Sequence, residues 1–328
     1  MQANFFQGQL MYTQFFGLSQ EPFDLNPDPK FLYLARSHFE AFSSMMAGIK
    51  ERKGIIVITG EPGVGKTLLI YTLLKDLADK VKTAFIFNPS LSFQNILENI
   101  LSALDVRFNE REKNLNSLLA RFRKYLSERL AREETVAVVI DEAQTLDIGA
   151  LENLLRFSDS DDPSARMLQI LLVGHPGLEE KLNSAKLRAY SEKIRVKCRI
   201  RPFTRGEGRG YLKYRLKLAG RDVSEIFTSG AVNQIWEFSR GIPRVMNLLC
   251  DRALFMGYEN SRPVIDSKII QEAVKDLDHL RCGGTRTFLG KFPRKTFWPK
   301  IPRILFFIFS ICVFLFSLYL LIPLLFRR

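Results

Sequence analysis

The sequence is poor in cysteine, and its few cysteines stand far apart. Four occur in 328 residues, and no two of them form a C-x-x-C pair. This spacing argues against a cysteine-ligated zinc site and against a disulfide framework. It is typical of a protein whose thiols stay reduced, as they do in the cytosol. The four are Cys198, Cys250, Cys282 and Cys312.

Acidic residues are missing from the C-terminal stretch. From residue 281 onward there are nine Lys and Arg and no Asp or Glu, so residues 1–280 carry only +4 of the net charge of +13. The basic balance therefore does not predict a nucleic-acid-binding face on the first 280 residues. The N-terminus lacks a basic start followed by an apolar run, so no cleavable signal peptide is expected.

Charge of either sign is absent from residues 304–326, which are mostly Phe, Leu and Ile. As a helix these 23 residues would span roughly 34 Å at about 1.5 Å per residue, enough to cross a bilayer core. Residues 281–303 carry seven Lys and Arg, against two beyond the run, and the richer flank should stay cytosolic. The sequence predicts one membrane-spanning helix, with the rest of the chain in the cytosol and almost nothing on the other side.

What the sequence does contain is a glycine-rich motif at 60–67, which fits G-x-x-x-x-G-K-[ST]. The apolar run at 54–59 before it indicates a buried parallel strand. Apolar residues at helical spacing over 68–77 follow it. Strand, glycine loop and helix together predict a phosphate-binding loop rather than an ordinary glycine turn.

The residue types in this loop point to ATP and Mg²⁺ as cofactors. Glycines let the backbone approach a phosphate, and successive N–H groups at a helix N-terminus attract the anion. Lys66 would reach the β- and γ-phosphates, and the Thr67 hydroxyl would hold Mg²⁺. The expected nucleotide-binding residues are Gly60, Glu61, Pro62, Gly63, Val64, Gly65, Lys66, Thr67 and Leu68.

A second motif follows another buried strand, at 136–140. Asp141 and Glu142 come directly after it, where open α/β sheets bind ligands. Asp141 would complete the Mg²⁺ shell, and Glu142 would orient and polarise the attacking water. A helix N-cap is the alternative role for Asp141. The two motifs together predict an ATPase.

Three further strands, at 83–87, 169–173 and 194–200, alternate with helical segments and predict an α/β fold with a five-stranded parallel sheet. After Pro202 the pattern is helical only. The chain thus divides into an N-terminal segment that packs on the core (1–53), an α/β nucleotide-binding domain (54–203), a small all-helical lid (204–278), a basic linker (279–303) and a transmembrane helix (304–326).

The N-terminal segment is rich in aromatic residues and prolines, and its aromatics are expected to bury against the nucleotide-binding domain. A helix is predicted over 37–49, with Ser37 in its cap region. His38 is interpreted as a structural or capping residue rather than a catalyst. Pro243 suits the first turn of a lid helix, which places Arg244 at a helix start.

The sequence of these motifs and of the residues around them resembles the general secretion pathway protein A (ExeA-type) family of AAA+ ATPases, over roughly residues 12–278. The AAA+ core and helical lid, the phosphate loop and the residues around it carry the resemblance together. The segments that match are Phe15-Phe16-Gly17-Leu18, Pro22-Phe23, Pro27-Asp28-Pro29, Phe31-Leu32-Tyr33, Asp141-Glu142-Ala143-Gln144, Val173-Gly174-His175-Pro176, Gly241-Ile242-Pro243-Arg244 and Leu249-Cys250-Asp251-Arg252-Ala253-Leu254.

The resemblance implies ATP hydrolysis linked to assembly of a secretion or pilus-like complex at the bacterial inner membrane, and a homo-oligomer. It implies that Arg244 is the lid arginine that senses the γ-phosphate. His175 stands at the sensor position, where the family usually has glutamine, and Arg188 or Arg195 would be the arginine finger acting in trans. The peptidoglycan-binding module of prototype members is lacking, so a direct role in opening the cell wall is not expected.

Two other functions compete with this one. An ATP-dependent DNA-binding helper of the transposition type would use the basic residues alternating over 193–201. That alternation fits an exposed edge strand as well, and a membrane helix disfavours movement along DNA, so nucleic acid is not an expected partner. A nucleotide-gated scaffold would have no need of Glu142.

Overall fold

The computed structural model describes residues 12–282, except for 78–80, 88–91, 110–112 and 159–161. The predicted membrane span at 304–326 lies outside the described residues, as does most of the linker at 279–303. Among the residues that are described, no helix is both long enough and apolar enough to cross a membrane. The described residues up to Leu277 belong to one compact unit.

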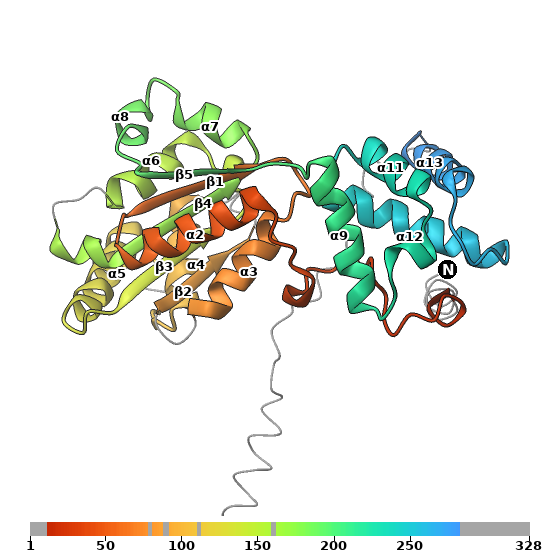
Figure 1. The fold of residues 1–328 in the computed structure, drawn as a ribbon. Helices are drawn as coiled ribbons and strands as arrows, with labels where there is room; N and C mark the ends of the chain where they lie inside the picture. Colours follow the sequence, from red (N-terminus) through yellow and green to blue (C-terminus); the bar gives the residue numbers. More distant parts are fainter. Residues whose placement is uncertain (1–11, 78–80, 88–91, 110–112, 159–161, 283–328) are drawn as a thin grey trace, which may run out of the picture. The chain divides into compact units, whose positions relative to one another are not determined.

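Five parallel strands form the sheet, in the order β2-β3-β4-β1-β5 (Figure 1). The prediction of a five-stranded parallel sheet is confirmed. β4 is buried along its whole length, as its continuous apolar run requires, whereas β5 at the edge alternates between covered and exposed side chains. The strands are β1 (Ile55–Gly60), β2 (Val81–Ile86), β3 (Thr135–Ile140), β4 (Leu168–Gly174) and β5 (Val196–Ile200).

Helices cover both faces of the sheet, because successive residues of each buried strand point to opposite sides. One apolar core joins alternate strand residues to α4, α5 and α6, and the other joins the intervening residues to α2 and α3. The helices and short 3-10 turns of this part are η1 (Pro29–Phe31), α2 (Arg36–Lys50), α3 (Lys66–Leu77), α4 (Phe93–Ala103), α5 (Leu115–Leu130), η3 (Ala143–Thr145), α6 (Ile148–Ser158), η4 (Pro163–Met167), α7 (Gly177–Leu182) and α8 (Arg188–Ser191).

The register of the sheet brings three strand ends together. Thr59 of β1 pairs with Gly174 of β4, and Ile140 of β3 pairs with Leu172 of the same strand. The segments that leave β1, β3 and β4 therefore emerge at one edge, with the end of β4 between the other two.

A helical region with its own apolar core follows β5. Its core combines residues from every helix of this region, including Leu212, Ile235 and Leu249. α12 starts at Pro243, as predicted. The helices are α9 (Arg205–Leu218), α10 (Val223–Ile226), α11 (Ser229–Ser239), α12 (Pro243–Glu259) and α13 (Ser267–Cys282).

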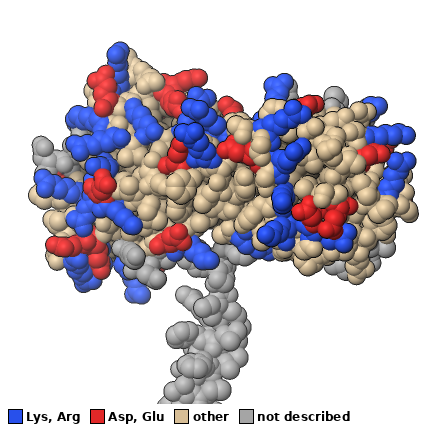
Figure 2. Space-filling model, in the orientation of Figure 1, with Lys and Arg blue, Asp and Glu red and all other residues tan. Residues whose placement is uncertain are grey.

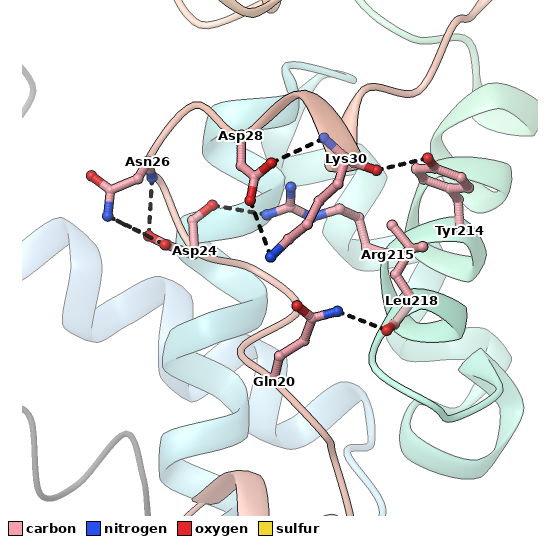
Figure 3. Close-up of polar contacts among 8 residues, drawn as sticks. All are labelled: Gln20, Asp24, Asn26, Asp28, Lys30, Tyr214, Arg215 and Leu218. Carbon is pink, nitrogen blue, oxygen red and sulfur yellow. Dashed lines mark hydrogen bonds and ion pairs between the residues drawn. The ribbon is translucent and has the colours of Figure 1, made fainter. Parts of the chain in front are cut away.

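The first part of the N-terminal segment packs on these helices and not on the nucleotide-binding domain, so that prediction is wrong for it. Tyr12, Phe16 and Phe23 belong to the core of the helical region. Figure 3 shows Arg215 of α9 reaching the segment, where its Nη2 donates to the Asp24 carbonyl at 2.8 Å. The cation lies 4.0 Å from the centre of the Phe31 ring. A segment rich in aromatic residues is predicted to be buried, but its sequence does not identify the part of the protein on which it packs. α2, the second part, does pack on the sheet.

The predicted cap at Ser37 is also wrong. α2 has Ala35 at its N-cap, without a side-chain cap bond, and Ser37 lies inside the first turn. The Ser37 hydroxyl instead donates to the Arg201 carbonyl at 3.4 Å. The Ser37 hydroxyl, which the local sequence assigns to a helix cap, therefore bonds to a residue far along the chain.

Candidate nucleotide-binding site

The loop between β1 and α3 has the backbone that close approach to a phosphate requires. Gly63 has φ +85° and Gly65 has φ +101°, in the left-handed region that favours glycine. A Cβ added to Gly63 would lie 2.9 Å from the Cβ of Arg244. Position 63 thus requires glycine for two reasons, the positive φ and the close approach of Arg244.

Lys66 is a buried cation at the start of α3. Its ammonium donates to the Gly60 carbonyl at 2.8 Å and to the Glu61 carbonyl at 3.1 Å, and the residue is only 6% exposed. Burial lowers the pKa of Lys66, against the opposing charges of Glu142 and Asp141. Among the described residues Lys66 forms no ion pair, although buried charges are normally paired. The loop therefore holds a cation that a phosphate would neutralise.

Thr67 and Asp141 meet although they are 74 residues apart. The Thr67 hydroxyl donates to Asp141 Oδ2 at 2.8 Å, and Asp141 Oδ1 accepts the Glu142 amide at 2.9 Å. Burial raises the pKa of Asp141, and the bond from Thr67 opposes this. A hydroxyl and a carboxylate side by side are the oxygen ligands that suit Mg²⁺.

Glu142 directly follows Asp141 and has a left-handed backbone conformation, φ 57°, which costs a non-glycine residue about 1–2 kcal/mol. Its side chain is exposed, and Oε2 accepts a hydrogen bond from the Gln144 amide at 2.6 Å. The side-chain oxygen Oε1 of Gln144 in turn accepts a hydrogen bond from the backbone N–H of His175 at 3.1 Å. Gln144 thus connects Glu142 to the end of β4.

His175 lies where the sequence placed it, directly after β4, but its ring is engaged locally. Its Nδ1 accepts the Gly177 amide at 3.0 Å, which leaves the proton of the neutral ring on Nε2. The ring is half-buried, and its backbone rather than its side chain makes the contact to Gln144.

Arg244 reaches the phosphate loop from the first turn of α12. Its backbone N–H donates to the Gly63 carbonyl at 3.2 Å. Burial lowers the pKa of its guanidinium. The position expected for a lid arginine is therefore in contact with the loop.

His38 also contacts the loop and was not among the predicted site residues. It is 2% exposed, and its Nε2 lies 2.8 Å from the Val64 carbonyl oxygen. A signal was present, because His38 shares helical spacing with Ala41, Met45 and Ile49, the buried face of α2. Gln144 is likewise buried; it closes the Asp141-Glu142-Ala143-Gln144 segment, but the sequence assigned it no role of its own.

The remaining predicted residues are less informative. Glu61 and Pro62 are exposed in the loop, and Leu68 is half-buried in the first turn of α3. Arg188 is exposed on α8 and pairs with Glu192 at 3.2 Å. Arg195 is exposed just before β5, so the choice of a trans arginine stays open.

The comparisons with known proteins agree with this geometry. Residues 49–182 match the family model described as an AAA domain. The chain is 34% identical over 275 residues to general secretion pathway protein A of Aeromonas hydrophila, covering 84% of this chain and 50% of that protein. The chain is an AAA+ protein related to general secretion pathway protein A. It spans about half the length of that relative.

Solved structures share the AAA+ fold. Cdc6p of Pyrobaculum aerophilum has a TM-score of 0.63 at 19% identity, covering 78% of this chain and 70% of that one. ORC2 of Aeropyrum pernix scores 0.60 at 19% identity, with coverage of 79% and 72%. Drosophila ORC bound to DNA scores 0.62 at 17% identity, with coverage of 79% and 64%. At these identities the similarity shows the fold alone.

AAA+ proteins generally bind ATP with Mg²⁺, and the residues present here fit both. The buried Lys66 cation and the positive-φ glycines suit a phosphate chain. The Thr67 and Asp141 oxygens suit the metal.

Proposed function

We propose that this chain is an ATPase whose residues Lys66, Thr67, Asp141 and Glu142 bind and hydrolyse Mg²⁺-ATP. The observation that carries the proposal is the buried Lys66 ammonium, which has no ion-pair partner within the described part of the chain, in a loop of positive-φ glycines. Among the described residues, the hydrogen-bond partners of this ammonium are the Gly60 and Glu61 carbonyls. Such a buried cation stabilises an arriving anion strongly, because the low local dielectric strengthens the attraction.

Each residue has a distinct role in the reaction. Lys66 exchanges its bonds to the loop carbonyls for bonds to phosphate oxygens. Thr67 and Asp141 hold the metal, which when bound neutralises charge on the transferring phosphoryl group. Glu142 orients a water molecule and accepts its proton. No covalent intermediate is needed, since positioning and charge stabilisation suffice.

Arg244 would report the nucleotide state to the lid. Its backbone already bonds to Gly63, so a change in the phosphate loop is transmitted to the start of α12. Lid movement would then alter contacts between copies of the chain, in the dimer or ring that we propose. Arg188 and Arg195 are the candidates for a finger from a neighbouring copy, and His175 for the sensor at β4.

The partners that we propose are components of a bacterial inner-membrane secretion or pilus-like complex. Support comes from the similarity to general secretion pathway protein A and from the uncharged run at 304–326. In this proposal residues 304–326 anchor the chain in the inner membrane and the ATPase domain faces the cytoplasm. Capture from detergent-solubilised membranes, with the chain held in its ATP state, would identify the partner complex.

A DNA-bound role is the second candidate, because the basic residues at 193, 195, 197, 199 and 201, in β5 and on either side of it, are all exposed. Against it, β5 is an edge strand, where exposed charges prevent pairing with other sheets. Figure 2 shows basic and acidic side chains interspersed on the face that it displays. Salt-sensitive binding to duplex DNA by the full chain would favour this candidate over the envelope role.

Nucleotide affinity tests the ATPase proposal most simply. Lys66→Ala should abolish tight ATP binding, because the phosphates lose their buried cation. Lys75→Ala is the matched control, since Lys75 is exposed on the same helix. Titration of a fluorescent ATP analogue measures both. Unchanged affinity in the Lys66 variant would remove the phosphate site from this loop.

A further inference from the structure

His38 makes a polar contact that packing alone does not explain. The Val64 carbonyl oxygen can only accept, so the Nε2–H of His38 is the donor across the 2.8 Å contact. Burial lowers the pKa of His38, and the bond to Val64 and the charge of Glu207 oppose this. Within the part of the chain that the structure describes, Nδ1 has no hydrogen-bond partner. The buried ring therefore has one polar contact, and that contact is the phosphate loop.

The contact controls the direction of a neighbouring amide. In a trans peptide the carbonyl of one residue and the N–H of the next point to opposite sides. The described residues contain no cis peptide bond, so the Val64 carbonyl and the Gly65 N–H are opposed. A bond that holds the carbonyl toward α2 turns the Gly65 N–H away from α2. That N–H makes no hydrogen bond to any described residue, and it directly precedes Lys66.

The orientation of the Val64–Gly65 peptide must be fixed by a hydrogen bond from another part of the chain. Gly65, at φ +101°, has no side chain to restrict its rotation. Without a bond to its carbonyl, the Val64–Gly65 peptide could turn over and present an oxygen, and not an N–H, to an incoming anion. The Gly63 carbonyl is fixed separately, because it accepts a hydrogen bond from the Arg244 N–H at 3.2 Å.

We propose that His38 is a positioning residue for phosphate binding: its bond to the Val64 carbonyl aims the Gly65 N–H at the nucleotide phosphates. The inference rests on the proposed function, since it concerns the same loop. It assigns α2 a part in nucleotide binding beyond covering the sheet.

The surroundings of His38 extend this role to the lid. Its ring centre lies 5.2 Å from that of Phe203, between β5 and α9. The Phe203 N–H donates to the Gly241 carbonyl at 2.8 Å, three residues before Arg244. His38 bonds to the Val64 carbonyl and Arg244 bonds to the Gly63 carbonyl of the phosphate loop. Contacts through Phe203 and Gly241 therefore connect these two residues.

Two amide substitutions of His38 separate positioning from packing. In His38→Gln the side-chain amide reaches about as far as Nε2 and can still donate to Val64. In His38→Asn the amide is one methylene shorter and cannot. The affinity of the full chain for a fluorescent ADP analogue should stay within about threefold of wild type for Gln and fall about tenfold for Asn, the usual effect of losing one such bond. His38→Leu, which fills the space without a donor, should behave like Asn.

Met45→Ala on the same helix face controls for stability, because Met45 is fully buried but has no polar contact with the loop. Its melting temperature should fall while its ADP affinity stays within threefold. Equal affinities for the Gln and Asn variants, with wild-type protein binding ADP normally, would overturn the role of His38 alone. Failure of the wild-type protein to bind ADP would overturn the proposed function and this inference together.

Discussion

Gln144 is the side chain that relates the acid at β3 to the end of β4. It donates to the Glu142 carboxylate and accepts from the His175 amide. Gln144→Ala should release the exposed Glu142 side chain and lower the turnover number by about tenfold, since hydrogen bonds to charged groups contribute about 1.5–3 kcal/mol. ATP affinity should change little, because the phosphate loop is untouched. Steady-state phosphate release and ATP titration give the two values.

Thr145→Ala is the matched control for Gln144. The Thr145 hydroxyl donates to the Glu142 backbone carbonyl at 2.8 Å and does not touch its carboxylate. Turnover in this variant should remain close to wild type. If Gln144→Ala also turns over ATP at the wild-type rate, Glu142 does not depend on this contact.

Residues in local motifs could be predicted, and residues brought in by the tertiary fold could not. Lys66 and Thr67 follow from a spacing that occurs where a strand meets a helix, and Asp141 from the end of an apolar run. Their proximity, a 2.8 Å bond across 74 residues, then follows from parallel strands ending at one edge. His38 contacts Val64, which is 26 residues away, and Gln144 contacts His175, which is 31 residues away, and no spacing rule predicts either of these two contacts.

The junction between β5 and α9 depends on a glycine. Gly241 has φ +73°, and a Cβ there would lie 2.1 Å from the Phe203 carbonyl oxygen. Gly241→Ala should therefore lower the free energy of unfolding by about 2 kcal/mol or more. Gly206→Ala is the control, because Gly206 is exposed in α9 with nothing within 4 Å, and it should raise stability by about 0.5 kcal/mol. Urea unfolding measures both, and equal effects would show that the junction tolerates a side chain.

α12 gives a second prediction at this scale. Arg244 lies in its first turn, with its backbone bonded to the phosphate loop. Arg244→Ala should weaken the coupling between ATP and oligomer state more than it weakens ADP binding, since the loop keeps its backbone bond. Sedimentation with ATP and with ADP is the measurement. ATP-driven assembly identical to wild type would exclude the Arg244 side chain from the mechanism.

Strands and helices could be predicted where the signal lies within the sequence of the element itself. All five strands and the start of α12 lie within a few residues of their predicted positions, because apolar runs and a helix-starting proline act locally. The docking of the N-terminal aromatics was not, because Tyr12 and Phe23 would satisfy any apolar surface. Their partners, such as Asp251 for the Tyr12 hydroxyl at 2.7 Å, are 239 residues away.

At the scale of the whole molecule, residues 304–328 should determine location and not nucleotide binding. The phosphate loop and its contacts lie within residues 38–244, so a chain that lacks 304–328 should bind ATP like the full chain. The full chain should stay in the membrane fraction after carbonate or high-salt washing, and the shortened chain should be released. Washing the full chain off would show that this run does not span the bilayer.

The central claim is that Glu142 activates water beside a nucleotide held by Lys66. Glu142→Gln keeps the size and the hydrogen-bonding reach of the side chain but removes its basicity. Phosphate release measured beside ATP affinity on this variant is the most direct test. The account predicts near-normal affinity with hydrolysis slowed at least about a hundredfold, the usual effect of removing a general base. Hydrolysis at the wild-type rate would contradict it.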